Sequence, residues 1–369
     1  MIKNNALGII FANSHDAMAG PLATHRSMAS LPFGGRYRLI DFSLSALSNA
    51  GIDKVGIITK ANYYSLMTHL GNGKPWDLDR KNGGLSILPP YASAETSPYK
   101  GKLEAIHGIL QYLREADEEN VVLCDSDVVA NIDIKNLIHY HNQKGAQVTV
   151  TYACGKKPMG QNDAMSFDIG ADGEVLKVDF SPADNCNYSL DTFVINRQLL
   201  IDIVEQEIAV GRVSLSHGIF ENGFGKYAIY AYKHEEYSLV IDSMQSFFTA
   251  NLDLLNRNVS KELFGGKNPI YTKTRDDMPA KYGLNAKANN AIIADGCIID
   301  GTVKNSVLFK GVKVEKGAVV ENCLLMEGTV VGENSVLKNI ITDRFVQITE
   351  NKTLVEESPC RYIEQKTVI

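Results

Sequence analysis

The chain has 369 residues, of which 44% are hydrophobic and 22% charged, a composition typical of globular proteins. Its formal net charge of -6 argues against a general nucleic-acid binder or a membrane-surface protein, because both need a basic face. No apolar run approaches the ~20 residues that span a membrane, and the N-terminus lacks the apolar core and cleavage site of a signal peptide. At this length two domains are expected.

The six cysteines are scattered along the chain, and none forms a C-x-x-C pair. A zinc site is therefore not expected. Several of them, such as Cys124, lie in apolar strand-like runs and are best interpreted as small buried hydrophobic residues. Free thiols in a chain without a signal peptide predict a cytoplasmic protein.

Short apolar runs alternate with stretches of helical periodicity from residue 7 to about residue 255. In 103–115, apolar residues recur at three- and four-residue steps, which predicts one amphipathic helix. Alternating strands and helices predict an α/β domain with a mostly parallel, Rossmann-like sheet and ligands at the carboxyl ends of its strands. The predicted strands are 7–12, 54–59, 121–124, 147–153, 174–180 and 191–195, and the predicted helices are 41–50, 64–70, 103–115, 134–144, 199–210 and 246–258.

The composition changes after residue 258, and 267–282 is rich in charge, proline and tyrosine. From Ala291 onward aliphatic residues recur every six positions, with glycine and asparagine at many of the corners between them. This period is typical of a left-handed parallel β-helix, whereas a β-sandwich would alternate at two without holding six. We therefore predict a sheet domain over 1–258, a linker over 259–290 and a left-handed β-helix over 291–369. The open edge of such a solenoid favours oligomerisation.

Several long motifs are similar to those of one enzyme family. They are F-G-G-R-Y-R-L-I-D-F-S-L-S at 33–45, G-N-G-K-P-W-D-L-D-R at 71–80, A-N-L-D-L at 250–254 and G-T-V-K-N-S-V-L-F-K-G-V-K-V at 301–314. The sequence resembles ADP-glucose pyrophosphorylase (glucose-1-phosphate adenylyltransferase) over essentially its whole length. The resemblance implies a nucleotidyltransferase domain followed by a left-handed β-helix, assembled as tetramers. The family joins ATP to glucose 1-phosphate and releases pyrophosphate.

That reaction needs glycines that admit backbone N–H groups to the triphosphate, cations that neutralise charge, and carboxylates that hold Mg²⁺. The family's glycine-rich phosphate loop falls on residues 13–18, which contain no glycine and place Met18 at the arginine position. Asp16 adds a negative charge where phosphates would lie. The lysine of the family's next motif falls on Met28, and the lysine that grips glucose 1-phosphate is missing from 180–184.

Of the two metal-binding carboxylates that the resemblance implies, one is retained. Asp127 stands at the family's G-D motif, whereas the second falls on Val240, which cannot ligate a cation. The family's nucleotide-contacting G-T-A-D-A-I reads G-K-L-E-A-I at 101–106. We therefore interpret Asp127 as the vestige of a catalytic centre with no intact catalytic set. No cofactor or metal is predicted for this chain, and Mg²⁺ is expected only in a catalytic partner.

These departures fit the D-type glycogen biosynthesis branch of the family, which acts as the non-catalytic partner of an active C-type subunit. We predict a non-catalytic or weakly catalytic regulatory subunit of ADP-glucose pyrophosphorylase, joined to the homologous catalytic subunit in a cytoplasmic heterotetramer. Nucleic acid and membranes are not expected partners. The alternative is an independently active glucose-1-phosphate adenylyltransferase or a related sugar nucleotidyltransferase. An acyltransferase, an activity common among β-helix proteins, is disfavoured because no histidine follows His234.

Two arginines follow the Gly-Gly pair of the first long motif. Arg36 stands where the family carries a basic residue that contacts sugar-phosphate activators, and Arg38 lies two residues further on. Two guanidinium groups beside Gly-Gly suit an anion, so we predict a regulatory phosphate site between the domains. The alternative is an ion pair with Asp41 or with a neighbouring chain.

Trp76, the only tryptophan, and Arg80 belong to the second long motif. We predict that they line the same regulatory cleft or a subunit contact, with a loop packed on its own domain as the alternative. His15 and His25 sit in the altered loop, and the sequence suggests no partner for either. Both are therefore interpreted as solvated or structural residues.

Overall fold

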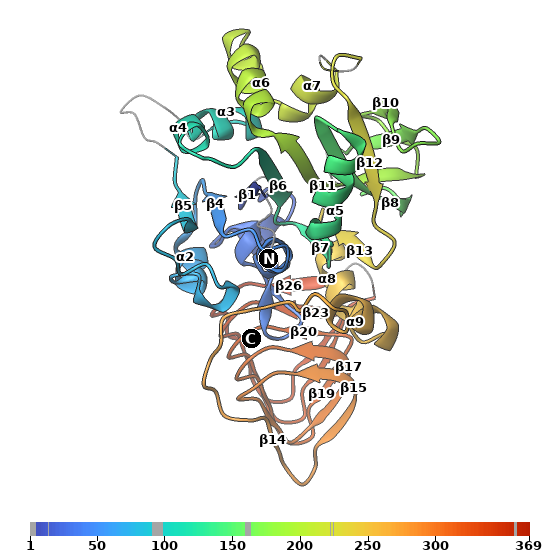
Figure 1. Ribbon diagram of the computed structural model, residues 1–369. Helices are drawn as coiled ribbons and strands as arrows, with labels where there is room; N and C mark the ends of the chain where they lie inside the picture. The colour runs from blue at the N-terminus through green and yellow to red at the C-terminus, as the bar shows by residue number, and fades with distance from the viewer. Residues whose placement is uncertain are drawn as a thin grey trace.

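The computed structural model describes residues 5–13, 15–90, 99–158, 164–221, 223, 225–357 and 360–369. Ser14, which belongs to the altered loop, lies outside the described residues. The chain forms a sheet domain, drawn at the top of Figure 1, and a tapering β-helix below it.

One mixed sheet organises the upper domain. Its first half is parallel and has the order β5 (Gly84–Leu88), β4 (Lys54–Ile58), β1 (Ala6–Phe11) and β6 (Asn120–Asp125). Its second half is built around β11 (Asn185–Asn196), which runs antiparallel to both β6 and β8 (Val148–Lys156). The remaining strands are β9 (Ser166–Ile169), β10 (Val175–Asp179) and β12 (Ile229–Lys233). The prediction of a mostly parallel sheet thus holds for the first half, whereas β11 makes the whole sheet mixed.

Helices cover both faces of the sheet, so alternate residues of β1 enter different cores. Ile10 lies in one core with α1 (Ile40–Asn49), α2 (Tyr64–Leu70) and α5 (Ile134–Lys144). Ile9 lies in the other with α3 (Lys102–His107), α4 (Leu110–Arg114), α6 (Arg197–Ala209) and α7 (Leu215–Phe220).

The predicted helix 103–115 is two helices, α3 and α4, because the chain tightens at Gly108 and Ile109. The Ile109 N–H donates to the carbonyl of Ile106, three residues back, in place of the usual fourth. Glycine is a poor helix former, which is consistent with a break at this point.

The end of β6 continues into a short two-stranded ribbon that joins it to a strand more than a hundred residues further along the chain. β7 (Val128–Ala130) pairs antiparallel with β13 (Ser238–Val240), and the N–H of Ile241 donates to the carbonyl of Asp127. The predicted helix 246–258 follows as two helices, α8 (Met244–Asp253) and α9 (Arg257–Phe264).

A hairpin of β2 (Pro32–Phe33) and β3 (Tyr37–Arg38) carries the Gly-Gly motif to the β-helix. Gly34 and Gly35 have φ of 56° and 85°, a conformation that side chains disfavour. A Cβ on Gly35 would lie 3.3 Å from Ile292 of the β-helix, so the close approach of the two domains also requires glycine here. Three short 3₁₀ turns lie nearby, η1 (Gly20–Ala23), η2 (Met28–Ser30) and η3 (Lys74–Trp76).

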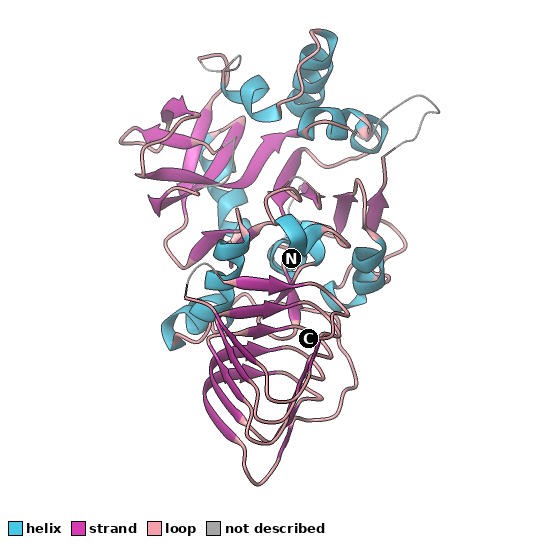
Figure 2. Cartoon of the chain, turned by 180° about the vertical axis from the view of Figure 1, so that it is seen from behind, coloured by secondary structure: helices cyan, strands magenta, loops and turns pink. Residues whose placement is uncertain are grey.

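The C-terminal domain is a left-handed parallel β-helix. The chain runs from α9 to the far tip, β14 (Lys281–Tyr282), and then coils back until β26 (Arg361–Ile363) lies beside the sheet domain, as Figures 1 and 2 show. Aliphatic residues of successive coils, such as Val303, Val320 and Leu337, stack in register and are fully buried. The other strands are β15 (Lys287–Ile293), β16 (Ile298–Ile299), β17 (Thr302–Leu308), β18 (Lys313–Val314), β19 (Val319–Glu321), β20 (Leu324–Leu325), β21 (Val330–Val331), β22 (Val336–Lys338), β23 (Ile340–Thr342), β24 (Gln347–Ile348) and β25 (Thr353–Val355).

The two domains join through a hydrophobic core and a buried ion pair. Phe247 of α8 belongs to one apolar cluster with Leu324 of the β-helix. Nη2 of Arg26 lies 2.6 Å from each carboxylate oxygen of Asp343, and both side chains are 1% exposed. The Tyr362 hydroxyl donates to the same carboxylate at 2.7 Å. The last coil of the β-helix is therefore fixed to the segment that follows the altered loop.

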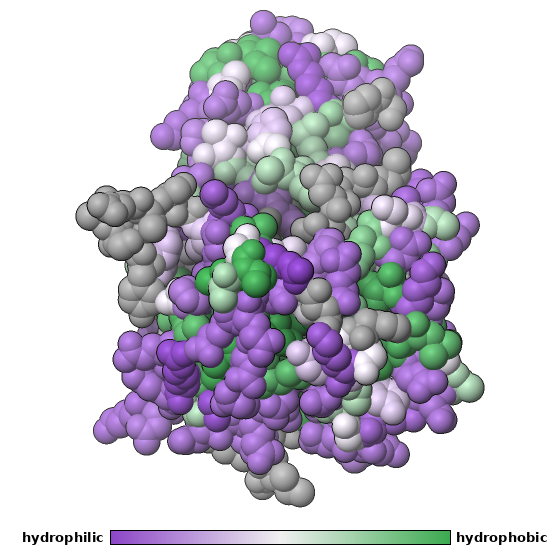
Figure 3. Space-filling model, turned by 90° about the horizontal axis from the view of Figure 1, so that it is seen from above, coloured by the Kyte–Doolittle hydropathy of each residue, from purple (hydrophilic) through white to green (hydrophobic). Residues whose placement is uncertain are grey.

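None of the helices in the described part of the chain is long and apolar enough to cross a membrane. Seen from above, hydrophilic residues cover most of the visible face, and hydrophobic residues form separate patches on it (Figure 3).

Candidate functional site

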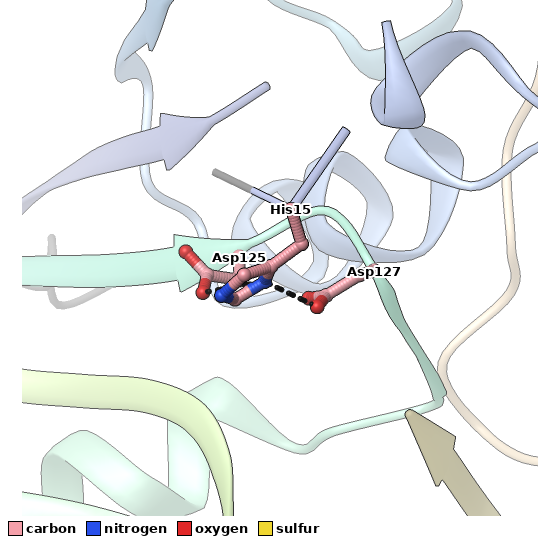
Figure 4. A group of neighbouring side chains, drawn as sticks. All are labelled: His15, Asp125 and Asp127. Atoms are coloured by element: carbon pink, nitrogen blue, oxygen red, sulfur yellow. Dashed lines mark hydrogen bonds and ion pairs between the residues drawn. The ribbon is translucent and has the colours of Figure 1, made fainter. Parts of the chain in front are cut away.

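The first candidate site lies where β1 and β6 end. β6 places Asp125 at its last position, the turn into β7 carries Asp127, and both carboxylates are buried. His15 reaches them from the altered loop after β1 (Figure 4). Its Nδ1 lies 2.6 Å from an oxygen of Asp127 and 3.8 Å from one of Asp125. The interpretation of His15 as a residue without a partner is therefore wrong, because its partner lies 112 residues away in the sequence.

A second cation reaches the same strand end from the first turn of α3. The ammonium of Lys102 donates to Asp125 in a short, buried ion pair and lies 5.6 Å from the centre of the Phe11 ring. In the sequence, Lys102 is visible only as a departure from the family's motif. A lysine gained in that motif, together with two aspartates at the end of the next predicted strand, is the signal that could have indicated the contact.

The pKa shifts follow from burial and from these contacts. Burial lowers the pKa of His15, but the Asp127 carboxylate outweighs it, and the pKa rises to about 9. Burial of Asp127 is likewise outweighed by His15, so the pKa of that carboxyl is lowered. Burial raises the pKa of Asp125 to about 7 against the attraction of Lys102. Burial also disfavours the charge on Lys102, but Asp125 and Asp191 more than compensate and raise its pKa. Both cations are therefore protonated at neutral pH.

The altered loop is tied to its own neighbours. One oxygen of Asp16 accepts from the N–H of Met28 at 2.7 Å, and the other accepts from the amide of Asn13 at 2.5 Å. The side-chain oxygen of Asn13, Oδ1, in turn accepts from the backbone N–H of Lys60. A cavity of about 250 Å³ remains beside the loop, between Lys60, Lys102 and α7.

The donors at this strand end do not fit the Mg²⁺ that the family's chemistry implies. Among the described residues, His15, Asp125 and Asp127 form one set whose ligand atoms lie within 4.8 Å of one another. Mg²⁺ prefers an octahedron of oxygen ligands. Here one of the three donors is an imidazole, Val240 offers no oxygen, and each carboxylate already contacts a protein cation.

The second candidate site is a pocket of about 100 Å³ between the β2–β3 hairpin and the β-helix. Five arginines line it, namely Arg26, Arg36, Arg38, Arg275 and Arg344, together with Lys273 and Lys310. Three acidic residues, Asp277, Asp295 and Glu327, also line it. Two of these pair with lining cations, since Lys310 contacts Asp277 at 2.6 Å and Arg275 contacts Glu327 at 3.6 Å. Positive charge is thus in excess.

The predicted arginines both line this pocket. Arg38 donates to the carbonyl and hydroxyl of Ser65, and its backbone N–H donates to Asp41. Burial lowers the pKa of Arg38 to about 10, with repulsion from nearby arginines, including Arg344, adding to it and Asp41 opposing. Arg36 is exposed and contacts the ring of Tyr37. One oxygen of Asp41 contacts His69 at 2.6 Å and the other accepts from the N–H of Arg38, and no Arg36–Asp41 ion pair is found in the described part of the chain.

The structure does not bring Trp76 or Arg80 into this pocket. Trp76 is 1% exposed and lies behind His69, whose ring meets it edge-on at 5.7 Å. Arg80 lies on the surface, where its guanidinium pairs with Asp77 and Asp53.

Two family models match the chain. The Nucleotidyl transferase model matches residues 20–164, and the GlmU-like, C-terminal hexapeptide model matches residues 278–358. These matches and the two folded units define a nucleotidyltransferase-type sheet domain joined to a hexapeptide-repeat β-helix.

Relatives of known name narrow this class to one family. The glycogen biosynthesis protein GlgD of Bacillus subtilis (strain 168) is 32% identical over 318 residues, which cover 86% of this chain and 83% of the relative. The glucose-1-phosphate adenylyltransferase of Geobacillus stearothermophilus is 30% identical over 337 residues, covering 87% and 84%. That of B. subtilis (strain 168) is 32% identical over 331 residues, covering 86% and 85%. The chain belongs to the GlgD-like family of glycogen-biosynthesis adenylyltransferases.

Proposed function

We propose that this chain is a regulatory subunit of ADP-glucose pyrophosphorylase, non-catalytic or weakly catalytic by itself, which modulates a homologous catalytic subunit in a cytoplasmic heterotetramer. The observation that carries the proposal is the contact between His15 and Asp127. The resemblance assigns to Asp127 the carboxylate that would hold the metal of the reaction, and the imidazole of His15 contacts that carboxylate at 2.6 Å. The glycine-free loop and Val240 support the same conclusion, because each removes a group that stabilises the transition state.

The interdomain pocket supports a regulatory role with a sugar-phosphate effector. Buried arginines repel one another there, and a phosphate would relieve that repulsion through paired hydrogen bonds. The Nε groups of Arg26 and Arg344 are buried, and within the described part of the chain no acceptor meets them. An effector bound between the domains would offer an acceptor to both of these groups.

An independently active glucose-1-phosphate adenylyltransferase is the second candidate. Asp127 is retained, and the 250 Å³ cavity lined by His15 and Lys102 could admit part of a substrate. This candidate requires the chain by itself to release pyrophosphate from ATP and glucose 1-phosphate.

One assay separates the two candidates. ADP-glucose synthesis is measured for this chain, for a catalytic homologue, and for their mixture, each with Mg²⁺ and with or without sugar-phosphate effectors. We expect little turnover by this chain, and in the mixture a higher kcat or a shifted effector dependence together with co-elution. Turnover by this chain that Asp127→Ala abolishes would establish the second candidate. No kinetic change and no complex on mixing would exclude the first.

A further inference from the structure

We propose that His15 and Lys102 take the place of a divalent cation at the end of β6, and that removing them reopens a divalent-cation site on Asp125 and Asp127. The inference deepens the proposed function and rests on it for the reading of Asp127 as a former metal ligand. It adds to the contact between His15 and Asp127 a role for Lys102, which the proposed function does not use.

Each carboxylate has a cation in direct contact, and His15 also lies 3.8 Å from Asp125. His15 Nδ1 contacts Asp127, and Lys102 Nζ contacts Asp125, from two different segments of the chain. These segments are the loop after β1 and the first turn of α3. Two side chains of the protein thus supply positive charge at the place where the reaction would require a bound metal ion.

Burial makes this substitution hard to reverse. Both aspartate side chains are 2% exposed, and those of His15 and Lys102 are 11% and 19% exposed. A buried carboxylate needs a partner, and the protein supplies one without the cost of dehydrating a metal ion. A divalent cation would have to displace an ammonium and an imidazolium into positions where each has lost its counter-ion.

The two contacts also hold the site closed. His15 fixes the altered loop to β6, and Lys102 fixes the start of α3 to the same strand end. Asp16 reinforces the loop through Met28. Ion pairs and hydrogen bonds between protein side chains therefore hold the strand end, and no metal ion is needed to do so.

The test uses the full-length chain and Mn²⁺ alone as the probe, read by electron paramagnetic resonance of unbound Mn²⁺. The variants are His15→Asn, Lys102→Thr and the double variant, in which threonine restores the residue of the family's motif. We expect the double variant to bind Mn²⁺ about tenfold or more tightly than the wild type. An opposite charge in contact lowers a carboxylate's affinity for a proton by about one to three decades, and Mn²⁺ competes with the protein cations for the same oxygens. Mn²⁺ should also raise the melting temperature of the double variant but not of the wild type.

Matched controls lie close by in the sequence. His25→Asn and Lys100→Thr make the same chemical changes outside the cluster and should leave Mn²⁺ binding at the wild-type level. Asp127→Asn, added to the double variant, should remove the gained binding.

The inference is overturned if the wild type binds Mn²⁺ as tightly as the double variant, or if the folded double variant binds none. Should that variant fail to fold, the single variants and the wild type decide, because Mn²⁺ bound to the wild type with hyperfine coupling to an imidazole nitrogen would contradict it. A wild type without such binding supports it. The readout is metal binding by this chain alone, so its failure leaves the mixing assay of the proposed function standing, and the reverse also holds.

Discussion

The end of β6 and the interdomain pocket both gather charged side chains, but the charges are balanced at the first site and unbalanced at the second. At the strand end, two buried carboxylates each meet a protein cation. In the interdomain pocket, arginines outnumber the acidic residues, and burial together with the neighbouring Arg26 lowers the pKa of Arg344. Charge that is matched within the chain leaves little for a ligand to neutralise, whereas surplus positive charge would be relieved by an anion. We therefore propose the interdomain pocket, and not the strand end, as the place where an anion binds.

The largest expected effect is the loss of stability on removing Arg26, which tests whether this arginine belongs with the paired charges or with the unpaired ones. Arg26 lines the interdomain pocket but is paired with Asp343, so it belongs with the matched charges. Arg26→Ala leaves a buried carboxylate without its cation and should lower the free energy of unfolding by about 3–5 kcal/mol. Denaturant unfolding measures the change.

Arg361→Ala provides the control for Arg26→Ala, because it breaks an exposed pair with Glu356 and should cost about 1 kcal/mol or less. Equal losses for the two variants would mean that the Arg26 contact contributes no more than a surface ion pair.

The second prediction concerns the pH dependence of stability, and it tests whether His15 and Asp127 form an ion pair at the strand end. The pKa of His15 is raised to about 9 in the folded protein, so protonation of His15 stabilises the fold. That contribution, on the order of 2 kcal/mol, is fully present below pH ~6.5 and is lost as the pH rises through about 9. Wild type and His15→Asn should therefore differ in melting temperature near pH 6 and converge near pH 10.

His25→Asn is the control for this pH series and should show no such convergence, because His25 is exposed and lies 3.5 Å from Glu364 at the surface. A difference between wild type and His15→Asn that stays constant from pH 6 to pH 10 would show that His15 acts by packing.

A third prediction tests the surplus charge of the interdomain pocket. Arg36→Gln and Arg38→Gln should each weaken the binding of a sugar phosphate about tenfold, since a charge-assisted hydrogen bond contributes about 1.5–3 kcal/mol. Isothermal titration calorimetry measures the affinity. Arg80→Gln, an arginine outside the pocket, should leave it unchanged, and an equal loss in that variant would place the anion elsewhere.

The smallest effect concerns Trp76, which lies behind the pocket wall. Trp76→Phe keeps most of the apolar volume and should cost about 1–2 kcal/mol of stability. Sugar-phosphate affinity should remain at the wild-type level, because His69 stands between the ring and the pocket. A large loss of affinity at unchanged stability would make Trp76 part of the regulatory site.

Local patterns were enough to predict the elements whose signals lie within one stretch of sequence. The hexapeptide period predicts the β-helix because each coil repeats the same inward positions, and strand–helix alternation predicts the parallel half of the sheet. The antiparallel insertion of β11 was not predicted, since strand direction is decided by partners far away in the chain. The break at Gly108 was also missed, because apolar spacing continues through it.

The candidate sites likewise divide into one that a local motif predicted and one that depends on contacts between distant segments. Arg36 and Arg38 were predicted from one short motif and do line a common pocket. The contacts of Asp127 with His15 and of Asp125 with Lys102 depend on tertiary folding over long separations, so the motif comparison registered only the missing groups and not the ones that replaced them.

The path of the C-terminal domain, from its far tip back toward the sheet domain, sets an order of events during synthesis. Domains made first fold first as a chain leaves the ribosome. The sheet domain can therefore take shape while the β-helix is still being translated, yet Arg26 must wait for Asp343 and Tyr362 in the final coil. Chains cut short before that coil would leave an arginine and its apolar surroundings uncovered, a feature by which cellular proteases and chaperones could distinguish unfinished molecules from complete ones.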